Sequence, residues 1–287
     1  MLMKTYKDAL EYGKQRLLEC KIEDAKLDAW LLLEHVSGIS RSWYFVHEDD
    51  EISQEDMEKY QRLIEQRGKH IPLQQLTKEA YFYGMKFFVN ENVLIPRQDT
   101  EILVEQVLNL SKGRENLKLL DMCTGSGCIL LALLANLKKA SGTGVDLSEK
   151  ALEVAQRNGR ELELEASWVQ SNLFDTVSGT YDIIVSNPPY IETAVIEGLM
   201  DEVKLYEPRM ALDGTEDGLF FYREITAQAG KYLNNNGILA FEIGYNQGKA
   251  VSEFMKENGY KEVQVLQDLA GLDRVVTGRI EKEEQHV

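Results

Sequence analysis

The sequence predicts an α/β protein in which a small helical domain and a β-hairpin linker precede a domain built on a seven-stranded, mainly parallel sheet. Apolar residues recur at helical spacing up to Arg67, and short apolar runs alternate with longer helical patterns from Leu117 onward. The last two apolar runs are joined by a loop too short for a parallel crossover. With 44% apolar residues, the chain has enough material for a large core, which excludes fibrous and fully disordered classes.

Residues 1–72 form the predicted helical domain. Leu10, Gly13 and Leu17 lie three or four positions apart, so they share one face of a helix. Further along, Ser53 and Asp56 are placed as a variant of the capping box, in which a side chain accepts the hydrogen bond of a free backbone N–H at a helix start. We therefore expect another helix to begin at this point.

Residues 73–98 form the predicted β-hairpin linker. Its residues alternate in the period of two that is typical of strands, with Asn90–Asn92 as the expected turn and residues 93–95 as the returning strand. Asp99 or Thr100 is the expected N-cap of the helix that opens the second domain, residues 99–280. The alternating residues are Tyr81, Tyr83, Met85, Phe87 and Val89.

The second domain contains seven predicted strands. Helical or irregular crossovers separate the first five, so these are expected to be parallel, and the last two form an antiparallel hairpin. Residues 281–287 are expected to be a flexible, solvated tail. The predicted strands are Lys118–Met122, Thr143–Asp146, Ser167–Gln170, Asp182–Ser186, Gly237–Ile243, Glu262–Leu266 and Arg274–Gly278.

Charge and cysteine content narrow the functional class. The net charge of −16 repels a phosphate backbone, so direct nucleic-acid binding is not expected, and nothing favours an anionic membrane. The longest apolar run, Cys128–Ala135, is too short to cross a bilayer, and the first residues lack a secretion signal. Three cysteines without a second Cys/His pair indicate reduced thiols in a cytoplasmic protein and no metal site.

A glycine-containing turn follows the first strand of the second domain. Residues Asp121–Cys128 run from this strand into an apolar helix, and the two glycines allow backbone N–H groups to approach a ligand closely. Asp146 ends the next strand, where an acidic residue accepts hydrogen bonds from ribose hydroxyls in dinucleotide folds. Leu130 replaces the third glycine of the NAD motif, and Asp121 favours a cationic ligand, so S-adenosylmethionine is the better fit. The proposed cofactor-binding residues in this turn are Thr124, Gly125, Ser126 and Gly127.

The segment Asn187-Pro188-Pro189-Tyr190 carries the predicted chemistry. It follows a buried strand and therefore lies at the carboxyl edge of the sheet, where ligands of open α/β folds bind. The Asn187 side-chain oxygen and the Pro188 carbonyl are expected to accept both hydrogens of a planar NH₂ group, while the Tyr190 ring covers its face. Holding a poorly nucleophilic nitrogen in line with a methyl donor contributes through proximity and orientation.

These residues resemble those of the protein-(glutamine-N5) methyltransferases, the HemK or PrmC family. The resemblance covers nearly the whole chain, and the hairpin and the Pro-Arg-x-Asp-Thr-Glu segment are more specific than the cofactor turn. The matching residues are Phe82-x-Gly84-x-x-Phe87-x-Val89, Val93-Leu94-Ile95-Pro96-Arg97-x-Asp99-Thr100-Glu101, Thr124–Gly127, Asn187–Tyr190, Tyr206–Arg209, Ala211-Leu212 and Asp217–Leu219.

The resemblance implies a class I S-adenosylmethionine-dependent methyltransferase with a Rossmann-like sheet. It implies transfer of a methyl group to the glutamine side-chain amide of a Gly-Gly-Gln motif in peptide-chain release factors, which tunes translation termination. The helical domain is then a substrate-recognition domain, and S-adenosylhomocysteine is the product. The implied catalytic residues are Asn187, Pro188 and Tyr190, with Asn187 also beside the cofactor. A monomer is expected.

Two residues depart from the pattern of this family. Cys123 stands where a glycine is usual, and a small side chain is tolerated there if φ is negative. Asn172 replaces an acidic residue, although its oxygen can still accept a hydrogen bond from the adenine amino group. Arg97 is a candidate substrate contact, but we expect Arg97 and Arg209 to pair with structural carboxylates instead.

Two other functions compete with this interpretation. A methyltransferase for the exocyclic amine of adenine or guanine would hold a flipped base in the same cage, but the negative charge disfavours it. A catalytically silent adaptor would use the helical domain only for docking. Such an adaptor should show a damaged cofactor turn or a damaged Asn187–Tyr190 segment, and neither is seen.

Overall fold

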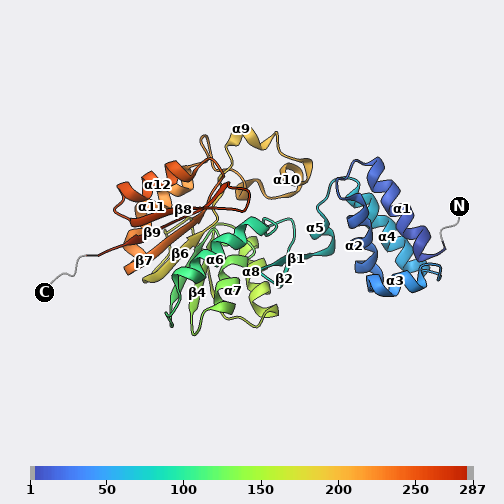
Figure 1. The fold of residues 1–287 in the computed structure, drawn as a ribbon, viewed down its shortest axis with the longest axis horizontal. Helices are drawn as coiled ribbons and strands as arrows, with labels where there is room; N and C mark the ends of the chain where they lie inside the picture. The colour runs from blue at the N-terminus through green and yellow to red at the C-terminus, as the bar shows by residue number, and fades with distance from the viewer. Residues whose placement is uncertain (1–3, 283–287) are drawn as a thin grey trace. The chain divides into compact units, whose positions relative to one another are not determined.

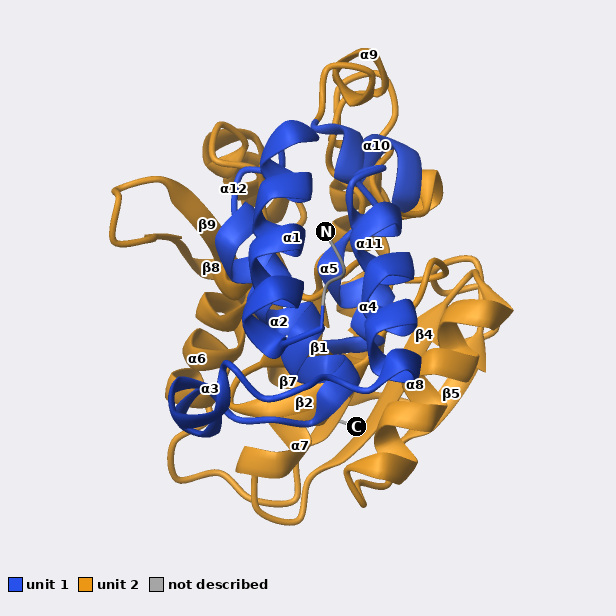
Figure 2. Ribbon diagram, turned by 90° about the vertical axis from the view of Figure 1, so that its right-hand side faces the viewer, with its two compact units in different colours: residues 1–79, 200–206 blue, residues 80–199, 207–287 orange. Residues whose placement is uncertain are grey.

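The computed structural model describes residues 4–282, so most of the predicted tail lies outside the described residues. The chain divides into two compact units, coloured separately in Figure 2. The first, here called the helical unit, comprises the residues up to Glu79 together with Met200–Tyr206. The second, the sheet unit, comprises Ala80–Leu199 and the residues from Glu207 onward. No helix among residues 4–282 is long and apolar enough to span a membrane.

The helical unit packs its helices around a core that includes Leu17, Leu32, Tyr60 and Ile64. Ser53 caps the fourth helix, because its hydroxyl accepts a hydrogen bond from the Asp56 backbone N–H at 3.1 Å, as predicted. The helices are α1 Tyr6–Glu19, α2 Ala25–Ser37, α3 Arg41–His47, α4 Gln54–Arg67, α5 Leu73–Thr77 and α10 Asp201–Tyr206.

Helix α10 is remote in sequence from the rest of the helical unit but is bonded to it. The buried guanidinium of Arg67 contacts Asp28 Oδ2 and Glu202 Oε1, each at 2.6 Å. The Tyr206 carbonyl accepts a hydrogen bond from Gln75 Nε2 at 2.7 Å, and its hydroxyl donates to the Lys69 carbonyl at 2.7 Å. The periodicity of apolar residues in the sequence did not predict this association, because the association depends on individual polar contacts.

The hairpin at the start of the sheet unit differs from the prediction. Strands β1 (Glu79–Phe82) and β2 (Met85–Phe88) are joined at Tyr83 and Gly84, which have φ of 49° and 73°. Two consecutive positive φ values are typical of a type I′ hairpin turn. The predicted turn at Asn90–Asn92 is present, because the Val93 N–H donates to the Asn90 carbonyl at 3.4 Å, but it does not join two strands, and the predicted strand over residues 93–95 is wrong. The aromatic alternation continues through the real turn, and this concealed it.

The sheet has the order β5-β4-β3-β6-β7-β9-β8, and Figure 1 labels its strands β4, β6, β7, β8 and β9. Its first five strands pair in parallel and the terminal β8–β9 pair is antiparallel, which confirms the predicted topology. Most strands extend one or more residues beyond their predicted bounds. The strands are β3 Lys118–Met122, β4 Ser141–Asp146, β5 Ser167–Gln170, β6 Tyr181–Ser186, β7 Leu233–Glu242, β8 Lys261–Gln267 and β9 Asp273–Ile280.

Helices cover both faces of this sheet. Leu103, in α6, and Leu131, in α7, belong to the core on one face, whereas Ile225, in α11, and Met255, in α12, belong to the core on the other. Both faces of β3 and β6 are therefore buried, which explains their continuous apolar sequences. The helices of the sheet unit are η1 Gln98–Thr100, α6 Glu101–Leu110, α7 Cys128–Asn136, α8 Glu149–Glu161, α9 Thr193–Ile196, η2 Arg209–Ala211, α11 Phe220–Tyr232 and α12 Gly248–Glu257.

Candidate active site

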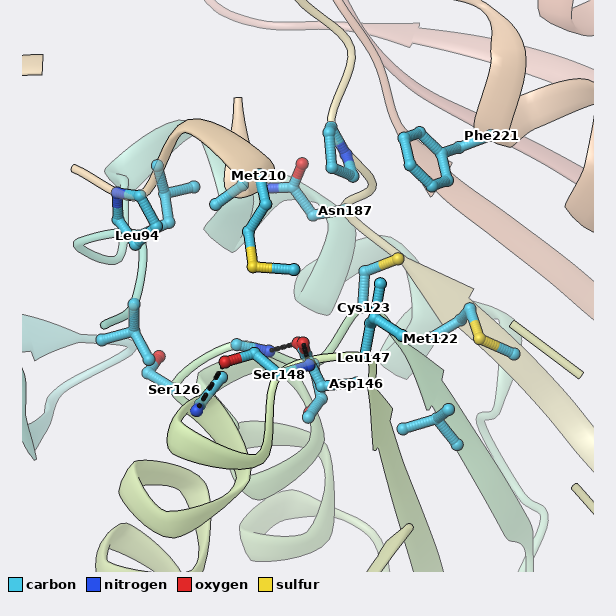
Figure 3. Close-up of a pocket in the computed structure, with 18 of the residues that line it drawn as sticks. Leu94, Met122, Cys123, Ser126, Asp146, Leu147, Ser148, Asn187, Met210 and Phe221 are labelled. Carbon is cyan, nitrogen blue, oxygen red and sulfur yellow. Dashed lines mark hydrogen bonds between the residues drawn. The ribbon is translucent and has the colours of Figure 1, made fainter. Parts of the chain in front are cut away.

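A cavity of about 380 Å³ lies in the sheet unit where strands β3, β4 and β6 end. Ligands of open α/β sheets bind at this carboxyl edge. Figure 3 shows Asn187 and Met210 on one side of the cavity and Asp146 and Ser148 across from them. The cavity thus brings together the two segments that the sequence selected, the turn after β3 and the segment after β6.

The turn after β3 is held in a left-handed backbone conformation. Gly125 and Gly127 have φ of 54° and 79°, and Cys123 has φ of 61°. The condition for tolerating Cys123, a negative φ, is therefore not met, and its side chain adds local strain that glycine would avoid. The Thr124 hydroxyl donates a 2.5 Å hydrogen bond to Asp121 Oδ2 and ties the turn to the end of β3.

The two glycines of the turn differ in the space around them. A Cβ built on Gly127 would lie 2.9 Å from the Trp168 ring and 3.1 Å from Ala155 Cβ, whereas one built on Gly125 would have no neighbour within 4 Å. Gly127→Ala should therefore lower the free energy of unfolding by about 2–4 kcal/mol through strain and overpacking. Gly125→Ala should cost only about 1 kcal/mol. Urea unfolding of both variants tests this, and equal losses would contradict it.

Asp146 anchors two loops at the edge of the cavity. Its Oδ2 accepts a hydrogen bond from the Gly125 backbone N–H and its Oδ1 accepts one from the Ser148 backbone N–H, both at 2.9 Å. Burial raises the pKa of the carboxyl group, while these backbone bonds oppose the rise. Each carboxylate oxygen has a further lone pair, so Asp146 can accept additional hydrogen bonds from hydroxyl groups of a ligand.

Asn187 lies directly after β6 and lines the cavity. Its Nδ2 donates to the hydroxyl of the buried Thr100 at 3.3 Å. Thr100 is the N-cap residue of α6, one of the two predicted, but its side chain makes no capping hydrogen bond, and Asp99 lies inside η1. Because the Asn187 NH₂ group is directed to Thr100, its carbonyl oxygen is the atom left to accept hydrogen bonds from a ligand.

The other residues of the Asn187–Tyr190 segment are placed differently from one another. Pro189 lines the cavity with Asn187, whereas Pro188 is buried and is not among the residues that line it. Tyr190 is also outside the lining. Its hydroxyl donates to Glu242 Oε1 at 3.4 Å, and its carbonyl accepts from Gln247 Nε2 at 3.0 Å. These contacts hold the Tyr190 end of the segment in place through residues outside the cavity lining.

Two arginines of the resemblance pair with carboxylates. Arg97 lines the cavity, and its Nη2 contacts Glu207 Oε1 at 2.5 Å. Arg209 Nη1 contacts Glu197 Oε1 at 3.1 Å on the exposed surface, and its Nε lies 3.6 Å from Asp213 Oδ2. Both arginines therefore pair with carboxylates, as expected, and Arg97, which also lines the cavity, stays a candidate substrate contact.

Asn172 lines the cavity, as predicted for a cofactor contact, but several apolar lining residues were missed. Leu94, Leu147, Met210 and Phe221 contribute to the wall. Leu147 and Met210 are 54% and 49% exposed, so they are large apolar side chains that the fold leaves uncovered. Sequence patterns cannot separate such residues from core residues, because both read simply as apolar.

Burial shifts the pKa values of three side chains in or next to the cavity, Asp121, Cys123 and Cys128. Burial raises the pKa of Asp121 to about 7, although the Thr124 hydrogen bond opposes the rise. Its Oδ1 has no hydrogen-bond partner in the described part of the chain. Burial also raises the pKa values of Cys123 and Cys128 well above that of a free thiol. These cysteines are therefore poor nucleophiles, and the chemistry must come from other groups.

These features fit S-adenosylmethionine. The cradle at Gly125 has room beside the backbone that no side chain fills, and Asp146 offers acceptors for a ribose. Burial disfavours the charged form of Asp121, and a cationic ligand beside it would offset this cost, whereas a phosphate would add to it. Apolar wall residues are suited to the flat face of an adenine ring.

The sequence and fold match known proteins. Residues 8–77 match the PrmC N-terminal domain family, and residues 97–203 match the methyltransferase small domain family. A release factor glutamine methyltransferase of Fusobacterium nucleatum is 40% identical over 96% of this chain and 77% of its own length. One of Geobacter sulfurreducens is 39% identical over 96% of this chain and 97% of its own length.

Among solved structures, the chain is similar to the T. thermophilus 16S rRNA N2 G1207 methyltransferase in complex with AdoMet and guanosine. The TM-score is 0.51 at 16% identity, over 71% of this chain and 50% of that one. The fold and the site therefore define an S-adenosylmethionine-dependent methyltransferase of class I. The full-length relatives narrow this class further: the chain belongs to the release factor glutamine methyltransferase family.

Proposed function

We propose that this enzyme transfers a methyl group from S-adenosylmethionine to the side-chain amide nitrogen of the glutamine in a release factor Gly-Gly-Gln motif. The observation that carries the proposal is the orientation of Asn187, whose NH₂ is bonded to Thr100 so that its oxygen remains for the acceptor amide. An acceptor for an NH₂ hydrogen, placed beside a cofactor turn, suits an amide or amine substrate.

The residues of the chain act mainly by positioning. Thr124–Gly127, Asp146 and Asn172 hold S-adenosylmethionine, which supplies an electrophilic methyl group on a sulfonium when bound. The Asn187 oxygen, which lines the cavity, accepts one amide hydrogen, and the carbonyl of Pro188, which lies outside the lining, is proposed to accept the other. Tyr190 supports this segment through its contact with Glu242, and we call residues 187–190 the acceptor corner. Pro188 and Pro189 restrict φ and lack backbone N–H groups, so the segment is rigid and these two residues cannot donate hydrogen bonds to its own acceptor oxygens. No general base is required before attack, because the methylated nitrogen is acidic and releases its proton to water.

The helical unit is proposed to recognise the release factor protein beyond the Gly-Gly-Gln motif. Residues 8–77 match a domain family that carries the name of this enzyme family. The negative charge of the chain disfavours nucleic acid as the direct substrate. A protein substrate is therefore favoured over a flipped base.

The direct test is incubation with labelled S-adenosylmethionine and a release factor, followed by peptide mass analysis. We expect a mass increase of one methyl group on the glutamine of the Gly-Gly-Gln peptide and none in the Gln→Ala variant of the release factor. Parallel reactions should contain RNA and DNA in place of protein. Label on the nucleic acid, with none on glutamine, would replace this proposal with a base-amine methyltransferase.

A further inference from the structure

A buried carboxylate lies next to the acceptor corner and has no role in the function proposed above. Glu242 ends strand β7 and is 3% exposed. Strands β6 and β7 pair in parallel with Ser186 opposite Phe241, so the next residues are Asn187, just after the end of β6, and Glu242, the last residue of β7. Glu242 Oε2 is buried and has no hydrogen-bond partner within residues 4–282.

Polar groups of the site converge on this carboxylate. The Tyr190 hydroxyl donates to Oε1 at 3.4 Å, and the Tyr222 hydroxyl donates to the Glu242 main-chain carbonyl at 2.9 Å. Interactions with the side chains of Thr100 and Asn187 lower the pKa of the Glu242 carboxyl group and so stabilise its charged form. Glu242 thus contacts Tyr190 and interacts with Thr100 and Asn187, which belong to, or support, the acceptor corner.

We infer that Glu242 is a positioning residue for the methyl acceptor, holding the amide of Asn187 through Thr100 so that its oxygen, and not its NH₂, faces the substrate. This inference rests on the proposed function. A carboxylate is an acceptor only, so the Thr100 hydroxyl must direct its hydrogen to Glu242 and its lone pair to Asn187 Nδ2. One ionised group therefore fixes the direction of the whole chain of hydrogen bonds.

The charge of Glu242 also has a chemical effect. A carboxylate that accepts from Thr100 polarises the next hydrogen bond and makes the Asn187 oxygen a stronger acceptor. During transfer, positive charge develops on the amide nitrogen, so a stronger acceptor stabilises the transition state more than the ground state. Protonated Glu242 becomes a possible donor, and the direction of the network is then no longer fixed.

The pKa of Glu242 makes this dependence measurable. Burial raises it to about 7, hydrogen bonds from Thr100 and Asn187 lower it, nearby Asp99 raises it and Arg274 lowers it. The other titratable groups around it are Tyr190, Tyr222 and Cys128, whose pKa values are all raised by burial, so they stay neutral near pH 7. The active, ionised form of Glu242 is lost as pH falls through 7, or slightly lower with a cationic cofactor bound.

The test uses Glu242→Gln in the full chain, with Glu257→Gln on the exposed face of α12 as the control. Glutamine preserves shape but places an NH₂ donor in the network. At pH 8 and saturating S-adenosylmethionine, kcat for release factor methylation should fall at least tenfold. The cofactor Kd from calorimetry and the KM for the release factor should stay within twofold. The decline of wild-type kcat below pH 7 should disappear in Glu242→Gln and persist in the control.

A second pair of variants covers the case in which Glu242→Gln does not fold. Thr100→Val removes the hydroxyl and should lower kcat to a similar extent, and Thr100→Ser should restore most of it. Wild-type kcat in Glu242→Gln, an equal loss of cofactor affinity, or equal activity of the Thr100 pair would each overturn the inference. Absence of methylated glutamine with the wild-type enzyme would instead refute the proposed function, and this inference with it.

Discussion

Replacing Asn187 with alanine should lower kcat for glutamine methylation by about 100- to 1,000-fold, the range seen when one preorganised hydrogen-bonding group is removed from an active site. The substitution deletes the oxygen proposed to hold the acceptor amide. It also removes the donor to Thr100, which is bonded at 3.3 Å. The loss should appear in single-turnover rates with saturating cofactor, because the missing contact is to the acceptor amide.

The same variant should bind S-adenosylmethionine with a Kd within a few-fold of the wild-type value, measured by calorimetry. Asn258→Ala, at the exposed C-terminal end of α12, serves as the control for a neutral asparagine substitution. An unchanged single-turnover rate for Asn187→Ala would refute the proposed role of Asn187 in holding the acceptor amide. A large loss of cofactor affinity would indicate that Asn187 binds the cofactor and not the acceptor amide.

Replacing Asp146 with alanine should raise the Kd for S-adenosylmethionine by about 100-fold, which corresponds to about 2.7 kcal/mol. Two effects contribute. The variant loses the acceptor proposed for the ribose hydroxyls, and it frees the Gly125 and Ser148 backbone N–H groups that Asp146 now binds at 2.9 Å. The cofactor turn is therefore less ordered before any ligand binds.

Asp146→Asn separates these two effects in part. It retains one acceptor oxygen but directs an NH₂ group toward a backbone donor, so it should still weaken binding, by less than alanine does. Calorimetry measures the Kd, and urea unfolding without cofactor reports the loosening of the turn. If Asp146→Ala binds the cofactor as tightly as the wild-type enzyme, the ribose assignment is wrong.

The sheet was largely predictable from sequence because its signals are strong and repeated. Buried parallel strands such as Tyr181–Ser186 read as continuous apolar runs, and a loop too short for a crossover forces the β8–β9 pair to be antiparallel. The hairpin turn was missed because Tyr83 adopts a positive φ, for which a tyrosine gives no sequence signal. Local strain of this kind is imposed by the surrounding structure.

The site was predictable only where residues lie on short, contiguous motifs. The cofactor turn and the Asn187–Tyr190 segment were found because each is continuous in sequence. Thr100 was interpreted as a helix cap, and Glu242 was interpreted as part of a strand, so their meeting beside Asn187 was not foreseen. Contacts that join three separate elements depend on the fold and have no signature in any one segment.

The association of α10 with the helical unit has a practical consequence for dissecting this enzyme. Trimming the chain after Glu79 would not yield two self-sufficient fragments, because Arg67 and Gln75 would lose their partners Glu202 and Tyr206. The C-terminal fragment would still contain Met200–Tyr206, a segment that belongs to the helical unit and would have lost its packing partners. A faithful excision of the catalytic half would also have to bridge Leu199 directly to Glu207.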